Sequence, residues 1–339
     1  MPELDPRDLI DRTAEQEVFR GIVPRTEGAD ASPRQARMLT ICDRGGRGKS
    51  SLLKRLLYNC QFDLKPQASG CIVELDRLAA NPSPFFLIRS IHEGLTKVTG
   101  ADIRDRFAKF QRLNAARELR DFSLFEEEGT GSSGVRVSAM ASIGSVSEGS
   151  RAAGVNLEHV QNAQITQTYQ RAEFTEEQEL RAQQKCVEAF FDDLRVVCAT
   201  QSVVVMFDTW ERCNLQLRDW IRDEFLANHT LNPDPNMRPD RLLVVVAGRP
   251  YEPPDTRYGL RSDEFRPLFD STEDLEATVR SVKELSQWEA EHVSRFMVLN
   301  GCPAPGEEEI QFIQSKLSLG WSLEKILTFI DQYLRPPQP

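Results

Sequence analysis

Five side chains in three separate stretches have the chemistry needed to bind and cleave a phosphate anhydride. Lys49 and Ser50 follow a glycine-rich run. Asp208 and Glu211 follow one apolar run, and Arg249 ends another. Lysine and arginine neutralise phosphate oxygens, a hydroxyl and a carboxylate suit Mg²⁺, and a second carboxylate can accept a proton from water. These residue types suffice for Mg²⁺-dependent hydrolysis, provided that the fold brings the three stretches together.

The stretch from Met38 to Leu53 has the pattern of a phosphate-binding loop. Residues 38–42 are apolar and predict a short buried strand, and leucines at helical spacing after Ser51 predict a helix. Between them, backbone N–H groups would turn toward phosphate oxygens, and the helix N-terminus would add a favourable dipole. Lys49 would reach the β- and γ-phosphates, and the Ser50 hydroxyl would hold Mg²⁺. The expected nucleotide-binding residues here are Gly45, Gly46, Arg47, Gly48, Lys49, Ser50 and Ser51.

One position departs from this pattern. The pattern G-x-x-x-x-G-K-[ST] requires glycine at position 43, where this chain has Asp43. A carboxylate there would repel a triphosphate unless its side chain turned away or paired, for example with Arg44 or Arg47. The alternative interpretation is a chance Gly-Lys-Ser sequence in an ordinary α/β domain.

Asp208 and Glu211 fit the other half of a phosphate site. Residues 203–207 are apolar, predict a buried strand, and lead directly to Asp208. Ligands bind at the carboxyl ends of strands in open α/β sheets, so Asp208 would orient the water shell of Mg²⁺. Glu211 would polarise the attacking water as a general base. The alternative is a buried strand that ends in a turn-favouring aspartate, with Glu211 capping the next helix.

Two arginines are further candidates for contact with a nucleotide. Residues 241–249 predict another buried strand, which would deliver Arg249 to the same edge as a sensor of the γ-phosphate; a surface ion pair is the alternative. Arg12 precedes a predicted capping box at Thr13 and Gln16 in a helix expected over residues 7–24. Arg12 could line the base pocket, or it could form an ion pair where that helix begins.

The remaining patterns predict an α/β domain with a parallel sheet flanked by helices. Residues 70–76 and 279–285 are further strand candidates. Helices are expected over residues 85–98, 101–125, 175–200, 210–228, 286–299, 307–317 and 323–334. We expect an N-terminal helical segment at 1–37, a core at 38–250 and a helical lid subdomain at 251–339. Residues 126–171 predict a flexible, β-rich insertion; the alternative is a partner-binding or self-associating β-arm.

Composition limits the possible partners. The 339 residues carry a net charge of -10, which argues against non-specific binding to nucleic acid or to an anionic membrane. No run approaches the roughly 18 apolar residues that span a membrane, and the N-terminus lacks the features of a secretion signal. The seven cysteines and four histidines show no metal-ligand spacing, so neither a disulfide framework nor a zinc site is expected. A cytoplasmic protein is the resulting expectation.

The motifs together resemble the STAND class of P-loop NTPases, the signalling class that includes NACHT and NB-ARC domains and is related to AAA ATPases. Residues 43–52 resemble its G-x-G-G-x-G-K-[ST]-[ST]-L loop, residues 207–211 its Walker B motif and residues 246–249 its sensor strand. Residues 285–290 resemble the start of its helical lid, and residues 10–15 the segment before its first strand. The chain departs from the class at Asp43 and in the lid, where the class has G-x-P and this chain has Gly320, Trp321 and Ser322.

The resemblance implies a P-loop NTPase core with a small C-terminal helical lid. Such a protein binds ATP and Mg²⁺, hydrolyses ATP to ADP, and uses its nucleotide state to control self-association or docking of a protein partner, as in bacterial signalling or defence. ATP is expected rather than GTP. The alternative from another class is a non-catalytic nucleotide-binding interaction module, which Asp43 and the missing lid proline favour. A metabolite or nucleic-acid kinase is weaker, because the separation of Lys49 from Asp208 is long for a compact kinase.

Overall fold

The computed structural model describes residues 12–24, 36–44, 48–78, 82–99, 101–120, 125, 175–232, 234, 236–251, 259–261, 263–283, 285, 290–299, 305–319, 321 and 323–330. The chain divides into two compact units, Met1–Phe110 with Val187–Pro339, and Gln111–Cys186. The predicted insertion at 126–171 lies outside the described residues, and so do Gly45, Gly46 and Arg47 of the predicted loop and positions 320 and 322 of the predicted lid.

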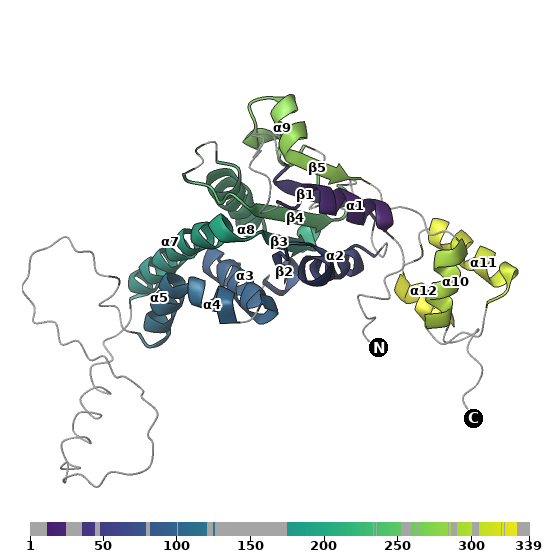
Figure 1. Cartoon of the computed structure of the whole chain (residues 1–339), viewed down its shortest axis with the longest axis horizontal. Coiled ribbons are helices and arrows are strands. Elements are labelled where there is room, and N and C mark those ends of the chain that lie inside the picture. The colour runs from purple at the N-terminus through teal and green to yellow at the C-terminus, as the bar shows by residue number, and fades with distance from the viewer. Residues whose placement is uncertain are drawn as a thin grey trace, which may run out of the picture. The chain divides into compact units, whose positions relative to one another are not determined.

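The first unit is built on a sheet of five parallel strands, labelled in Figure 1. They are β1 (Met38–Cys42), β2 (Ser69–Glu74), β3 (Val203–Asp208), β4 (Leu242–Gly248) and β5 (Val279–Val282). Their order is β2-β3-β4-β1-β5, so β4 lies between β1 and β3. Every residue of β3 and β4 is buried, which explains why their sequences are continuous apolar runs. The prediction of an α/β fold with a parallel sheet is confirmed, whereas the P-loop identity and the lid stay predictions.

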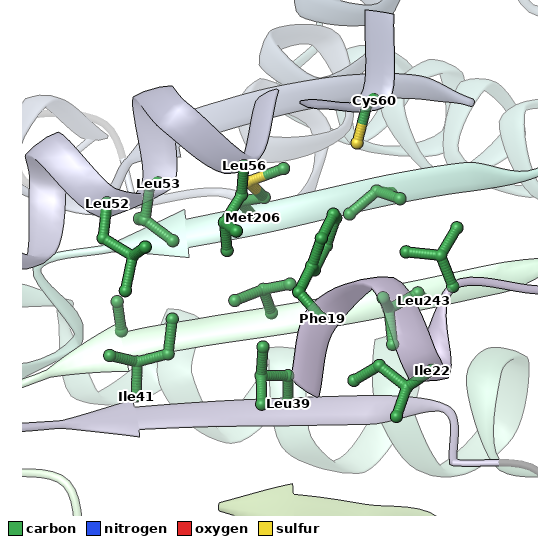
Figure 2. Packing of buried hydrophobic residues seen from close by; sticks show 14 of the residues in the cluster. Phe19, Ile22, Leu39, Ile41, Leu52, Leu53, Leu56, Cys60, Met206 and Leu243 are labelled. Atoms are coloured by element: carbon green, nitrogen blue, oxygen red, sulfur yellow. The ribbon is translucent and has the colours of Figure 1, made fainter. Parts of the chain in front are cut away.

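Two helices pack on one face of this sheet. They are α1 (Thr13–Ile22) and α2 (Lys49–Tyr58), and α2 continues as a π-helix, η2 (Asn59–Asp63). Figure 2 shows side chains of both helices lying over strand residues of β1, β3 and β4: Phe19, Ile22, Leu52, Leu53, Leu56 and Cys60 over Leu39, Ile41, Met206 and Leu243. Burying each large aliphatic side chain contributes about 1.5–3 kcal/mol. This core fixes the first turn of α2, and therefore Lys49, relative to the ends of the strands.

Aromatic side chains dominate the core that involves α3 (Pro84–Thr99), α7 (Glu176–Thr200), α8 (Leu215–Trp220) and the π-helix η6 (Ile221–Thr230). Phe207 of β3 meets Phe225 edge-on, with ring centroids 5.6 Å apart, and Phe225 lies 5.6 Å from Phe191 of α7. A Cβ at Gly94 of α3 would lie 2.7 Å from the Cβ of Cys71 in β2, so only glycine permits this approach. Phe207 precedes Asp208, so this packing fixes the end of β3.

The other described α-helices are α4 (Ala101–Arg106), α5 (Ala108–Glu118), α9 (Thr272–Thr278), α10 (Ala290–Leu299), α11 (Glu307–Ser318) and α12 (Leu323–Phe329), and a 3-10 helix, η7 (Arg266–Leu268), precedes α9. The last three α-helices share a core of their own, made of Val293, Met297, Ile313, Leu317, Ile326 and Ile330. In the second unit, Arg117 of α5 and Glu179 of α7 form an ion pair with Nε and Oε1 2.8 Å apart. None of the helices in the described part of the chain combines the length and apolar character needed to cross a membrane.

Several predicted elements differ from the observed ones. The single helix expected over 210–228 is three elements: a 3-10 helix η5 (Trp210–Arg212), then α8 and η6. Asn214 separates the first two, because its side chain accepts the Gln216 N–H and caps α8. The predicted capping box at Thr13 is wrong: Arg12 is the N-cap residue of α1, with φ of 84° and no side-chain cap. The strand expected over 70–76 ends at Glu74, where a 3-10 helix η3 (Leu75–Leu78) begins.

Candidate functional site

The carboxyl ends of three neighbouring strands meet at one edge of the sheet. β1 ends at Cys42, which lies opposite Gly248 of β4, and the Asp43 N–H donates to the Gly248 carbonyl at 3.3 Å. Arg249 follows Gly248 directly, and Asp208 is the last residue of β3, the other neighbour of β4. Parallel pairing therefore delivers Asp43, Asp208 and Arg249 to the edge where ligands bind in open α/β folds.

Lys49 begins α2 after a tight turn. Gly48 has φ of 88° and ψ of 22°, a left-handed conformation that glycine adopts without a Cβ penalty. The buried Lys49 side chain extends back to the end of β1, where Nζ donates to the carbonyls of Asp43 at 2.5 Å and of Arg44 at 2.8 Å. An ammonium has three N–H donors, so with these two carbonyls as its partners among the described residues, one donor is left for an anionic ligand.

Charged groups from three strand ends act on the Lys49 ammonium. Burial lowers the pKa of Lys49, because desolvation disfavours the charged form. The carboxylates of Glu211, Asp43 and Asp208 act in the opposite direction and raise that pKa, while Arg249 lowers it. The structure therefore places the predicted residues Lys49, Asp208, Glu211 and Arg249 within electrostatic reach of one another.

The predicted metal ligands, Ser50 and Asp208, lie close enough for the Ser50 side chain to act on the Asp208 carboxyl group. Asp208 Oδ1 accepts the Thr209 N–H at 2.8 Å. Burial raises the pKa of Asp208, and the Ser50 side chain and the Thr209 N–H act against this shift by favouring the carboxylate. Thr209 has φ of 59°, an uncommon conformation for a β-branched residue. This turn sends the chain into η5, the element that carries Glu211.

Glu211 and Arg249, the predicted base and sensor, are partners of each other. Glu211 Oε1 lies 3.1 Å from Arg249 Nε, and Glu211 Oε2 accepts the Arg249 backbone N–H at 3.0 Å. The approach of η5 to the end of β4 depends on Gly248, since a Cβ there would lie 2.9 Å from the Trp210 Cβ. The Arg249 side chain is 46% exposed, so it can exchange this partner for a ligand with little rearrangement of the core.

Asp43 turns its side chain onto two backbone N–H groups. Asp43 Oδ1 accepts the Arg44 N–H at 2.6 Å, and Asp43 Oδ2 accepts the Leu285 N–H at 3.2 Å in a buried hydrogen bond. The first contact is with the backbone of Arg44, although the sequence suggested its side chain. Leu285 follows β5 and was not among the predicted site residues. No local signal could identify it, because it is 242 residues from Asp43 along the chain.

Residues 259 and 260, which follow β4 in the chain, are hydrogen-bonded to Arg249 and to Arg218. Leu260 donates its N–H to the Arg249 carbonyl at 2.7 Å. Arg218 of α8 donates through Nη2 to the Gly259 carbonyl at 3.1 Å and also forms a buried ion pair with Glu264. The segment that bonds to the Arg249 backbone is therefore itself bonded to Arg218, whose buried ion pair sequence patterns did not reveal.

The remaining predicted site residues have different positions. Ser51 is half-buried in the first turn of α2. Arg12 is buried, and its Nη1 lies 3.8 Å from Glu15 Oε1, so the predicted ion pair at the helix start is present. A role for Arg12 in binding a base stays a prediction. Gly45, Gly46 and Arg47 lie outside the described residues, as noted above.

The donor set at this edge fits an anionic ligand with a hard cation. The Ser50 hydroxyl and the Asp208 carboxylate are oxygen ligands of the kind that Mg²⁺ prefers. In the described part of the chain, no group of three or more His, Cys, Asp or Glu residues is arranged to hold a metal ion. A cation here would therefore take its other ligands from water and from the bound anion, as Mg²⁺ commonly does with phosphates.

Comparison with known proteins identifies no family for this chain. No protein-family model matches the chain, and no curated protein matches it.

Proposed function

We propose that this chain is an ATP-binding, Mg²⁺-dependent ATPase whose nucleotide state controls self-association or docking of a protein partner. The observation that carries the proposal is the group of Asp208, Glu211 and Arg249 around the buried ammonium of Lys49 at one edge of the sheet. A cation pair of Lys49 and Arg249 next to a hydroxyl and a carboxylate matches what a triphosphate and its metal ion require.

Each described site residue has a distinct part in this proposal. Lys49 and Arg249 would bind oxygens of the β- and γ-phosphates, and the backbone around Gly48 would face the phosphates at the start of α2. Ser50 and Asp208 would hold Mg²⁺, which supplies charge neutralisation when bound. Glu211 would hold the attacking water and accept its proton.

The contact between Glu211 and Arg249 suggests that hydrolysis is slow until Arg249 moves away from Glu211. Glu211 uses both carboxylate oxygens on Arg249, one on the side chain and one on the backbone N–H. A general base must have an oxygen within about 2.6–3.2 Å of the water it activates. Movement of the Arg249 side chain toward a γ-phosphate would free Oε1 for that water.

The same contact favours a second candidate function. If Arg249 keeps Glu211 engaged while nucleotide is bound, the protein would hold ATP without cleaving it. The chain would then act as a nucleotide-binding interaction module, in which the bound nucleotide orders the site and a partner recognises the ordered form.

An ATPase assay on the purified chain separates the two candidates. The variants are Lys49→Ala, Glu211→Gln and the control Lys54→Ala, which removes an exposed lysine from the same helix. Turnover by wild type and Lys54→Ala that is lost in the other two variants supports the enzyme. Tight ATP binding without turnover in wild type supports the interaction module. If wild type neither binds nor cleaves ATP, both candidates are wrong.

The switch is tested by the size of the particle. Sedimentation of the wild-type chain with ADP and with a slowly hydrolysed ATP analogue should give different association states, or different binding of a partner. The Lys49→Ala variant should give one state under both conditions. Identical behaviour of wild type with both nucleotides would show that nucleotide state does not control assembly.

A further inference from the structure

Asp43 occupies a position where its carboxylate has two structural partners and its carbonyl a third. The carboxylate accepts N–H groups from Arg44 and Leu285, and the carbonyl accepts the Lys49 ammonium. Asp43 is 9% exposed, so water cannot readily replace a lost donor. Asp43 is thus hydrogen-bonded both to Lys49 and to Leu285, which follows β5.

The contact with Leu285 bridges two parts of the chain that are distant in sequence. Residues 279–282 form β5, which pairs with β1, and helix α10 begins at Ala290. Leu285 lies between these elements, and its side chain is buried in the core shared by α1, α2 and the strands. The Asp43 carboxylate therefore holds, through a hydrogen bond, the backbone of Leu285, which lies between β5 and α10 in the chain.

A bound triphosphate would change the energy of this contact. The Asp43 carboxylate acts electrostatically on the Lys49 ammonium. Phosphates bound to that ammonium would repel any side-chain position that brings the carboxylate closer to it, because like charges repel strongly where water is scarce. The phosphates would therefore disfavour the alternative side-chain positions and leave the position that accepts the Leu285 N–H more populated.

We propose that Asp43 couples phosphate binding at Lys49 to the backbone at Leu285, so that a bound triphosphate tightens the hydrogen bond between the Asp43 carboxylate and the Leu285 amide. The inference rests on the proposed function, since it assumes a triphosphate on Lys49. It assigns to Asp43 a role that glycine, the residue of the phosphate-loop pattern, cannot perform. Coupling between two sites is reciprocal, so an intact contact at Leu285 also alters the affinity for the triphosphate.

Amide hydrogen exchange at Leu285 is the direct test. The probe is ATPγS with Mg²⁺, added to the full chain, and exchange is read at single-residue resolution. In wild type, the triphosphate should slow exchange of the Leu285 amide about fivefold or more, the lower end of typical coupling. In Asp43→Gly, exchange without ligand should be faster than in wild type, and the ligand should no longer change it. Asp43→Asn, which keeps one acceptor oxygen and loses the charge, should show a reduced response.

Binding affinity separates coupling from a merely structural role. Asp43→Gly removes a carboxylate that repels phosphate, so it should bind ATPγS as tightly as wild type or more tightly. The matched control is Asp193→Asn, because Asp193 is also 9% exposed and its carboxylate also accepts a backbone N–H, that of Phe110 at 2.8 Å. This control should keep the full response at Leu285.

Two results would overturn the inference. Wild type that binds ATPγS without slower exchange at Leu285 would show that Asp43 transmits nothing, and the proposed function would stand. If Asp43→Gly binds ATPγS more than tenfold more weakly and its exchange at Leu285 is that of wild type, Asp43 has only a structural role in the binding site. Wild type that does not bind ATPγS would overturn the inference and the proposed function together.

Discussion

The buried ion pair between Arg218 and Glu264 provides a quantitative test of how the site is supported. Arg218 Nε donates to Glu264 Oε1 at 2.8 Å, and Arg218 Nη2 donates to Glu264 Oε2 at 2.5 Å. The side chains are only 8% and 6% exposed. Arg218 also donates to the Gly259 carbonyl, and its guanidinium lies over the Trp210 ring at 5.1 Å. Arg218→Ala would remove all of these contacts and leave the Glu264 carboxylate buried without its cation.

The expected loss of stability is large. Removing one partner of a buried pair costs about 3–5 kcal/mol, because the remaining charge is desolvated and uncompensated. Replacing both partners with apolar residues, as in Arg218→Met with Glu264→Leu, should cost much less, about 1 kcal/mol or below. The assay is denaturation by urea, with free energies of unfolding extrapolated to water. Arg261→Ala is the control, because its ion pair with Asp263 is solvent-exposed and should contribute nothing measurable.

The double variant decides whether this reasoning holds. If Arg218→Ala and the double variant lose the same stability, the penalty comes from lost packing and the unpaired Glu264 charge has no role in it. If Arg218→Ala loses less than about 1 kcal/mol, the pair is not buried as described.

Three further predictions follow from individual residues. Asp208→Asn should increase the free energy of unfolding at pH 7 by about 0.5–2 kcal/mol and abolish the proposed ATPase activity. Burial raises the folded-state pKa of Asp208, so its charge destabilises the fold above that pKa, and this penalty disappears as the pH falls through it. Burial also lowers the pKa of His92 to about 4, so wild type should lose stability as the pH falls from about 6.5 to 4, a loss that His92→Phe should reduce in pH-dependent melting curves. Gly48→Ala should cost about 1–2 kcal/mol in urea denaturation, because alanine is strained at φ of 88°.

The sheet could be predicted because its central strands are buried on both faces. β3 and β4 are apolar runs, β3 ends at Asp208, and Arg249 directly follows the last residue of β4. Both features depend only on residues that are adjacent in the sequence. The apolar runs alone therefore sufficed to predict that Asp208 and Arg249 lie where strands end.

The helices after the strands were predicted less well, because single side chains and backbone angles control where they begin. The stretch expected as one helix from Trp210 is divided by the cap at Asn214, a residue type that favours helix starts and could have indicated the break. Arg12 begins α1 in a left-handed conformation that is rare outside glycine, so the pattern pointed to Thr13 as the cap.

The contacts of Asp43 and Glu211 could not be read from the sequence. The Asp43 carboxylate accepts the backbone N–H of Leu285, and the Glu211 carboxylate accepts that of Arg249. Every residue except proline has a backbone N–H, so the residue type does not reveal such a donor. The pattern marked Asp43 only as a residue that does not belong in a phosphate loop. Its partners became visible once β1 and β5 were placed side by side.

Calorimetric titration of ATP with Mg²⁺ into the wild-type chain and into Lys49→Ala tests the central claim most directly. In the described part of the chain, the buried Lys49 ammonium has two carbonyl partners, and the proposed function requires its third N–H donor to bind a phosphate. We predict saturable binding to wild type with one ATP per chain, and at least tenfold weaker binding to Lys49→Ala, a difference of about 1.4 kcal/mol or more. Equal affinity in the two proteins, or no binding to wild type, would contradict the account.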